Sequence, residues 1–316
     1  MDLAGKKILV IGGAGFIGSY IITELLKEKV AEIVIFDDFS RGTMDNISEA
    51  LKDSRVRIYE KGGNILHTDI LNDAMKGVDG VFHLAALWLM HCDQFPRAAF
   101  HVNIEGTFNV LEACRDNKIK RLVYSSSASV YANAVEKPMT ENHPLNGKNF
   151  YGATKIAGEA MLTAFVHKYN LSAVGLRYMN VYGKGHTDHG AYVGIIPRTL
   201  RNIAEGRPPI IHGDGSQAFD FIHAKDIAIS NICAMKAETT GEFYNISTGV
   251  QTTVKDVIER ILKATNSKLN PEYQNPNVDN KTLVTDRIGS TEKAQKDLGF
   301  KYHITLDEGI KMTIKV

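Results

Sequence analysis

The sequence predicts an α/β protein built on a doubly wound parallel sheet, and three observations point to this fold class. Strand-like and helix-like segments alternate over about the first 180 residues, which is the pattern of a parallel sheet with helices on both faces. A glycine-rich turn joins the first strand-like segment to the first helix-like segment. The 316 residues, 44% of them hydrophobic, suit one large or two small domains.

The predicted elements follow one another in a regular order. Short apolar or β-branched runs, each typical of a buried strand, occupy residues 7–12, 32–37, 56–62, 80–85, 121–126 and 172–178. Helix-period segments between them predict helices over residues 17–29, 69–75, 103–117 and 152–169. Beyond residue 180 the sequence predicts a loop at 186–190, a helix at 196–205 and an irregular segment at 206–215. Helices over 226–236, 253–265 and 291–298 then surround a strand over 242–247.

Charge and cysteine content argue against several classes of function. Lys and Arg total 37 and Asp and Glu total 36, so the formal charge is +1 and no basic field is present to hold a nucleic acid. Cys92, Cys114 and Cys233 include no CxxC spacing, which argues against a disulfide framework or a zinc site. We therefore predict a cytoplasmic protein without a nucleic-acid partner.

Residues 8–23 follow two lysines and imitate a signal peptide. Four glycines would weaken a membrane helix there, and the run is shorter than the ~20 apolar residues that span a bilayer. No other stretch is long enough, so we expect a soluble protein with no membrane partner. His186 and His189 share a loop, but no third ligand is visible, so no metal is expected.

The glycine-rich turn has the spacing of a dinucleotide-binding site. Gly12-x-x-Gly15-x-x-Gly18 lies between a predicted strand and a predicted helix, as in Rossmann folds, where the helix N-terminus faces the pyrophosphate. The second strand ends at Asp37, whose carboxylate suits the ribose hydroxyls and repels a 2′-phosphate. The sequence therefore predicts NAD rather than NADP. Arg41 is the one feature that favours NADP, and we interpret it as a solvated loop charge.

A second motif is a candidate for acid-base chemistry. Tyr151-x-x-x-Lys155 lies at the start of a predicted helix, and its i,i+4 spacing places phenol and ammonium on one face. The strand over 121–126 runs into Ser127, at the carboxyl edge where doubly wound sheets bind ligands. An ammonium held near the phenol would lower the pKa of Tyr151 and make it a base near neutral pH.

Together these motifs resemble the extended short-chain dehydrogenase/reductases, specifically the NAD-dependent nucleotide-sugar epimerase/dehydratase family and its UDP-glucose 4-epimerase-like branch. The similarity covers nearly the whole chain. The motifs that carry it are GGAGFIG at 12–18, HLAA at 83–86, NIEGT at 103–107, SSSASVY at 125–131, YGATK at 151–155, RYMNVYG at 177–183 and GDGSQ at 213–217.

The resemblance implies a role for each matching residue. Tyr151 is the expected base, Lys155 its activator and a ligand of the nicotinamide ribose, and Ser127 the hydroxyl partner of the reacting sugar oxygen. Asn64 and Ile65 are expected beside adenine, and His83 is expected only to pack. The full set expected to bind NAD is Gly12, Gly15, Phe16, Ile17, Gly18, Asp37, Asp38, Asn64, Ile65, Leu84, Ala85, Ala86, Ser125, Tyr151, Lys155 and Tyr178.

The resemblance also implies a division of the chain and a homodimer. Residues 1–178 with about 240–250 are expected to bind NAD, and residues 179–239 with 251–316 to form a smaller α/β domain that binds the nucleotide sugar. Members of the family commonly pair two helices into a four-helix bundle. In this chain those helices start near Asn103 and Tyr151.

The expected reaction follows from residues that are missing. Dehydratases of the family carry Thr-Asp-Glu where this chain has Ser127-Ala128-Ser129, and its decarboxylases use a Glu at the position of Ser129. Hydride transfer at a sugar hydroxyl remains, and 4-epimerisation of a UDP-hexose through a 4-keto intermediate is the leading hypothesis. Two alternatives stay open: a 4-dehydrogenase that releases the keto sugar, for example from a GDP-sugar, and a non-catalytic dinucleotide-binding regulator.

The substrate side departs from the family. Phe219 stands where the family usually has an Arg that binds the pyrophosphate of the sugar nucleotide. Asn180 and Arg287 are expected to hold the phosphates instead. Trp88, the single tryptophan, lies over the sugar in one interpretation and is simply packed in the other.

Overall fold

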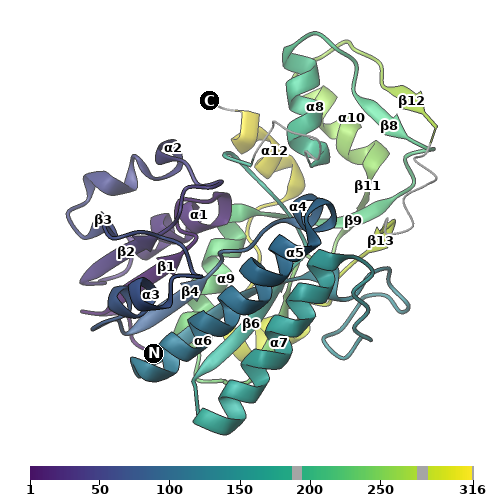
Figure 1. Cartoon of the computed structure of the whole chain (residues 1–316). Helices are drawn as coiled ribbons and strands as arrows, with labels where there is room; N and C mark the ends of the chain where they lie inside the picture. Colours follow the sequence, from purple (N-terminus) through teal and green to yellow (C-terminus); the bar gives the residue numbers. More distant parts are fainter. Residues whose placement is uncertain (187–193, 276–283, 315–316) are drawn as a thin grey trace.

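A computed structural model describes residues 1–186, 194–275 and 284–314 (Figure 1). Seven parallel strands form its central sheet, in the order β10-β6-β5-β4-β1-β2-β3. Their bounds are β1 Lys7–Ile11, β2 Glu32–Phe36, β3 Val56–Ile58, β4 Gly80–His83, β5 Arg121–Ser127, β6 Ala173–Tyr178 and β10 Glu242–Ile246. The predicted doubly wound parallel sheet is confirmed.

Helices cover both faces of this sheet because its central strands are apolar on both sides. Along β1, Ile8 and Val10 belong to one core cluster, whereas Leu9 and Ile11 belong to the other. The first cluster lies under α1 (Phe16–Leu25), α9 (Ala224–Lys236) and α11 (Glu292–Leu298). The second lies under α3 (Thr68–Ala74), α6 (Gly106–Asp116) and α7 (Phe150–Tyr169) (Figure 1).

A smaller α/β unit follows the sixth strand of the central sheet. Its four-stranded sheet has the order β11-β9-β13, with β7 also paired to β9, and a two-stranded sheet joins β8 to β12. A small core of its own includes Tyr182, Phe221 and Ile261. The elements are β7 Asn180–Tyr182, α8 Ile195–Ala204, β8 Ile210–His212, β9 Ala218–His223, β11 Gln251–Thr253, α10 Val254–Ala264, β12 Glu272–Gln274, β13 Asp286–Arg287 and α12 Leu306–Ile314.

Several elements were not predicted from the sequence. The predicted helix over 103–117 begins as a π-helical turn, η2 Phe100–Glu105, and continues as α6. The strands of the smaller unit are short, so they carry little periodic signal. The remaining elements are α2 Met44–Ile47, η1 Ala50–Lys52, α4 Leu89–Gln94, α5 Pro96–Ala99 and η3 Ala128–Val130.

Among the described residues, no helix is long and apolar enough to cross a membrane. Across the same parts of the chain, no group of three or more His, Cys, Asp or Glu side chains is placed to hold a metal ion. His189 lies outside the described residues, and the loop predicted at 186–190 is described only at His186.

Candidate active site

The glycine-rich turn after β1 has the geometry that a dinucleotide pyrophosphate requires. Gly12 has φ +81°, and a Cβ on it would lie 2.8 Å from the backbone nitrogen of Ala85. A Cβ on Gly18 would lie 2.3 Å from the carbonyl oxygen of Gly12, so the helix approaches the turn this closely only with glycine. No side chain caps the N-terminus of α1 at Gly15, which leaves its first N–H groups available to an anion. These residues fit the phosphates of NAD.

Asp37 follows β2, beside the glycine-rich turn. Its Oδ2 accepts a hydrogen bond from the backbone of Ala14 at 2.9 Å, and its Oδ1 accepts one from Phe39 at 2.9 Å. Burial raises the pKa of Asp37, and the two backbone hydrogen bonds act in the opposite direction. Asp38 is exposed and its carboxylate accepts hydrogen bonds from Ser40. The carboxylate of Asp37 therefore ties the end of β2 to the turn that follows β1.

Asn64 and Ile65 lie in the loop after β3. The Oδ1 of Asn64, the acceptor assigned to adenine, accepts a hydrogen bond from the backbone of Leu66 at 2.9 Å. An amide oxygen has a second lone pair, so it can still accept from a ligand. Ile65 is buried, and a Cβ on Gly106 would lie 2.5 Å from its side chain.

Ser127, Tyr151 and Lys155 come together at the carboxyl end of β5. Ser127 is the last residue of β5, and Tyr151 and Lys155 lie in the first turns of α7, which begins because Asn149 accepts a hydrogen bond from Gly152. The ammonium of Lys155 donates to the carbonyl of Ser125 at 2.7 Å and lies 5.7 Å from the centroid of the Tyr151 ring. The structure thus brings together the three residues that were predicted as catalytic.

The ionisation of the phenol differs from expectation. Burial raises the pKa of Tyr151 to about 12, while a hydrogen bond with Ser127 and the charge of Arg41 lower it. Burial also lowers the pKa of Lys155 to about 8. The expected lowering of the Tyr151 pKa is therefore not found in the protein by itself, because the loss of hydration outweighs the nearby charges, and the role of Tyr151 as a base depends on its pKa in the complex with NAD.

The other residues predicted to bind NAD lie around this edge. Leu84, Ala85 and Ala86 form the loop that leaves β4, next to Gly12. The hydroxyls of Ser125 and Tyr178 share a hydrogen bond of 2.9 Å between β5 and β6. His83 is buried, with its Nε2 3.0 Å from the hydroxyl of Thr107, so it has the packing role expected for it.

The residues predicted to bind substrate lie on separate elements. Asn180 begins β7 and is partly exposed, and Trp88 is the N-cap residue of α4. Arg287 is buried in β13, where its guanidinium donates to the carbonyl of Ala132 at 3.3 and 3.4 Å. Phe219 packs edge-on against Phe221 in β9, with ring centroids 6.2 Å apart.

Three residues near this edge were missed or misjudged. Arg41, which we interpreted as a solvated loop charge, is exposed as a residue, but its guanidinium lies 4.7 Å from the centroid of the Trp88 ring. The ring of His186 stacks on Phe16 at 4.8 Å. Cys92 is buried, and burial raises the pKa of its thiol to about 11. These contacts join distant segments, so no local sequence pattern could have revealed them.

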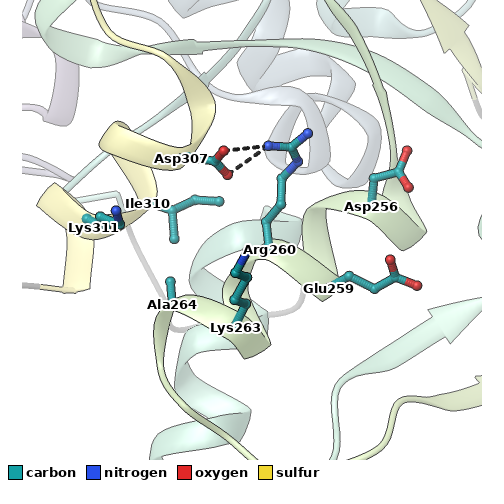
Figure 2. Close-up of a pocket in the computed structure, with 8 residues that line it drawn as sticks. All are labelled: Asp256, Glu259, Arg260, Lys263, Ala264, Asp307, Ile310 and Lys311. Atoms are coloured by element: carbon teal, nitrogen blue, oxygen red, sulfur yellow. Dashed lines mark hydrogen bonds and ion pairs between the residues drawn. The ribbon is translucent and has the colours of Figure 1, made fainter.

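A hollow of about 600 Å³ lies elsewhere, between α10 and α12 (Figure 2). Arg260 crosses it and donates to both carboxylate oxygens of Asp307 at 2.7 Å. None of the predicted site residues lines this hollow. The lining residues are Asp256, Glu259, Arg260, Lys263, Ala264, Asp307, Ile310 and Lys311.

The fold and the site together define a Rossmann-type protein with a dinucleotide site beside a Ser-Tyr-Lys constellation. Residues 8–247 match the family model described as the NAD dependent epimerase/dehydratase family. The chain belongs to this family, as the motifs indicated.

Individual relatives extend over almost the whole chain. A Methanocaldococcus jannaschii protein, provisionally named a UDP-glucose 4-epimerase, is 32% identical over 309 residues, which cover 97% of each chain. The UDP-N-acetylglucosamine 4-epimerase of Methanobrevibacter ruminantium M1, solved with UDP-N-acetylmuramic acid, has a TM-score of 0.92 at 29% identity and covers 99% of this chain and 98% of its own. The UDP-glucuronic acid 4-epimerase of Bacillus cereus, solved with UDP-glucuronic acid and NAD, has a TM-score of 0.88 at 26% identity, with 98% of both chains covered.

Proposed function

We propose that the protein is an NAD-dependent nucleotide-sugar 4-epimerase that acts on a UDP-hexose or a similar sugar. The observation that carries the proposal is the convergence of Ser127, Tyr151 and Lys155 beside a glycine-rich turn fit for a pyrophosphate. Relatives and solved neighbours named as UDP-sugar 4-epimerases match along almost the full chain, which supports the same activity here.

Each residue of the constellation has a proposed task. Tyr151 accepts the proton of the sugar O4 hydroxyl and returns it, and Ser127, hydrogen-bonded to Tyr151, orients that oxygen. Lys155 is held by the carbonyl of Ser125 and places its charge 5.7 Å from the centroid of the Tyr151 ring. Bound NAD supplies the acceptor for the C4 hydride and its donor on return.

The segment after β5 favours epimerisation over elimination of water. Ser127, Ala128 and Ser129 carry no carboxyl group, and Ser129 is buried. General acid-base elimination needs a proton donor and acceptor beside the sugar C5 and C6, and no residue of this segment offers them. The proposed reaction therefore passes through a 4-keto intermediate that loses no water and takes back its hydride on the other face.

The fate of the hydride tests this function. We expect the enzyme, incubated with UDP-glucose, UDP-N-acetylglucosamine, UDP-glucuronic acid and GDP-sugars, to form the C4 epimer of one of them without net absorbance at 340 nm. Chromatography of the same samples measures the product. Stoichiometric NADH with a released keto sugar would instead establish the 4-dehydrogenase, and NAD binding without conversion of any sugar would establish the regulator.

Cofactor choice is proposed to depend on Asp37. We expect the wild type to bind NAD more tightly than NADP, because the carboxylate accepts from a ribose diol and repels a 2′-phosphate. Asp37→Asn should weaken NAD binding by about tenfold to a hundredfold, the range of a charge-assisted hydrogen bond. Calorimetric titration measures the affinities for NAD and NADP, with Asp2→Asn as control, because Asp2 is exposed and is not among the residues expected to bind NAD. Tighter binding of NADP by the wild type would contradict the assignment.

A homodimer through α6 and α7 is also proposed. These two helices lie side by side (Figure 1), and Phe100 before α6 and Phe108 within it are 47% and 40% exposed. The exposed positions of α7 include Ala153, Ala160 and Ala164, which allow another helix to approach closely.

Sedimentation velocity at micromolar concentration tests the dimer. We expect a dimer for the wild type and a monomer for Phe108→Lys, because the charge would be buried in an apolar interface. Tyr273→Lys is the matched control, since Tyr273 is 56% exposed in β12, far from these helices in the chain. A monomeric wild type would contradict the proposed interface.

A cytoplasmic location is also proposed. Cys92, Cys114 and Cys233 are all free thiols, which fits a reducing compartment such as the cytoplasm.

The division of the chain into two binding domains is proposed as well. Residues 1–178 with about 240–250 bind NAD, and the rest of the chain binds the nucleotide sugar. The separate small core around Phe221 and Ile261 supports this division. Helices α9 and α11 depart from it, because they fall in the ranges assigned to the smaller domain but cover the central sheet.

A further inference from the structure

Arg41 and Trp88 form a contact between two loops at the carboxyl edge of the central sheet. Arg41 lies in the loop after β2, and Trp88 lies in the loop after β4. The guanidinium carbon is 4.7 Å from the centroid of the indole ring. In the sheet, β1 lies between β4 and β2, so these loops flank the glycine-rich turn that follows β1. A contact between them therefore crosses that turn.

The backbone around Arg41 is held against the glycine-rich turn. Thr43 donates its N–H to the carbonyl of Ala14 at 3.1 Å, and the side-chain amide of Asn46 donates to the same oxygen at 2.9 Å. A Cβ on Gly42 would lie 2.7 Å from Oδ1 of Asp37 and 2.8 Å from the Cβ of Ala14, so the loop packs closely there. Arg41 is thus an exposed side chain on an anchored loop.

The charge of Arg41 affects the pKa values of two neighbouring side chains, Tyr151 and His186. It lowers the pKa of Tyr151 in part, and it contributes to a pKa of about 4 for His186, which burial mainly causes. His186 stacks on Phe16, the first residue of α1. The guanidinium therefore acts on the space bounded by the N-terminus of α1, Tyr151 and Trp88.

The glycine-rich turn provides no positively charged side chain for a pyrophosphate. The turn GGAGFIG at 12–18 contains no Lys or Arg, so it can give a pyrophosphate only N–H donors and the helix dipole. A pyrophosphate carries two negative charges, and a guanidinium binds phosphate oxygens through paired donors. An aromatic ring under the guanidinium orients its plane and is itself stabilised by the cation.

We propose that Arg41, stacked on Trp88, closes over the pyrophosphate of the bound dinucleotide from the side opposite the glycine-rich turn and supplies its cation. This inference rests on the proposed NAD site. It assigns Arg41 to the two phosphates common to NAD and ADP-ribose, and to neither the 2′-phosphate of NADP nor the sugar of the substrate.

The single tryptophan makes the proposal directly measurable. Trp88 is the one Trp of the chain, so its fluorescence reports on this contact alone. We expect ADP-ribose to change the emission of the wild type, because the ligand lies beneath the Arg41 guanidinium. Arg41→Gln should bind both ADP-ribose and NAD about 10- to 100-fold more weakly, and Arg41→Lys should lie between. Adenosine, which has no phosphate, should bind all three proteins equally.

Arg57→Gln is the matched control. Arg57 lies in β3 and pairs with Glu32 at 2.6 Å, at the start of β2 and away from the carboxyl edge. Its replacement should leave ADP-ribose binding unchanged. Calorimetry on every variant gives the affinities independently of fluorescence, and thermal melts that match the wild type show that the exposed Arg41 is not needed for folding.

The outcomes separate the inference from the proposed function. A wild type that binds neither NAD nor ADP-ribose would remove the cofactor site, and the inference with it. If the wild type binds both ligands and Arg41→Gln binds them equally well, the proposed contact of Arg41 with the pyrophosphate is overturned while the cofactor site stands. A loss confined to NADP would assign Arg41 to the 2′-phosphate, and an increase confined to the KM for the nucleotide sugar would assign it to the substrate; either result overturns the proposal.

Discussion

Tyr151→Phe is expected to lower kcat by about 10²- to 10⁴-fold while dinucleotide affinity stays nearly unchanged. The variant removes the phenolic oxygen proposed to accept the O4 proton, and general acid-base catalysis contributes this range. It keeps the ring that packs near Lys155, 5.7 Å from the ammonium. Steady-state epimerisation assays, paired with NAD titration by calorimetry, measure the two effects separately.

Tyr124→Phe is a matched control for that experiment. The Tyr124 ring is also close to the ammonium of Lys155, at 5.0 Å, but its hydroxyl is buried against Gly158 and has no hydrogen-bond partner among the described residues. Loss of this hydroxyl should leave turnover close to that of the wild type. A Tyr151→Phe enzyme as fast as Tyr124→Phe would show that the proton acceptor is another group.

Glu159→Gln is expected to destabilise the fold by about 3–5 kcal/mol, because it leaves the charge of Arg177 buried without its partner. The two side chains are 4% and 5% exposed, and both carboxylate oxygens accept from the guanidinium, at 2.7 and 2.9 Å. Glu159 also accepts from Ser126 at 2.6 Å, so one carboxylate links α7 to β5 and β6. Urea denaturation measures the loss.

A surface pair provides the comparison for this second prediction. Glu49 and Lys52 are 2.8 Å apart, but their side chains are 84% and 71% exposed. Glu49→Gln should change the free energy of unfolding by at most about 1 kcal/mol, because water solvates either charge alone. Equal losses for Glu159→Gln and Glu49→Gln would mean that the buried pair contributes no more than a surface pair.

The local patterns of the sequence were sufficient for most of the central sheet. Strands such as β1 and β2 are apolar on both faces, a pattern that is complete within each run of five residues. The boundaries of the helices agreed to within a few residues where capping residues or glycine mark them, as at Asn149 before α7. The short strands of the smaller unit could not be predicted, because three residues are too few to show a period.

The site was partly predictable for a similar reason. Gly12, Gly15 and Gly18 lie in one segment, and Tyr151 and Lys155 are one helical turn apart, so their spacing is visible in the chain. Ser127 could be placed at the same edge because the carboxyl ends of parallel strands lie together. The pKa of Tyr151 was misjudged, because it depends on burial by the assembled protein and on the charge of Arg41.

By itself the sequence determined the fold class, the glycine-rich turn, the Ser-Tyr-Lys set and the family, since each depends on residues close together in the chain or on motifs in a known order. The tertiary structure decided the neighbours across the sheet. The order β4-β1-β2 brings Arg41 over Trp88, and the packing of α7 on the sheet buries Glu159 with Arg177. Such pairs depend on strand order and on exclusion of water, which arise only when distant segments assemble.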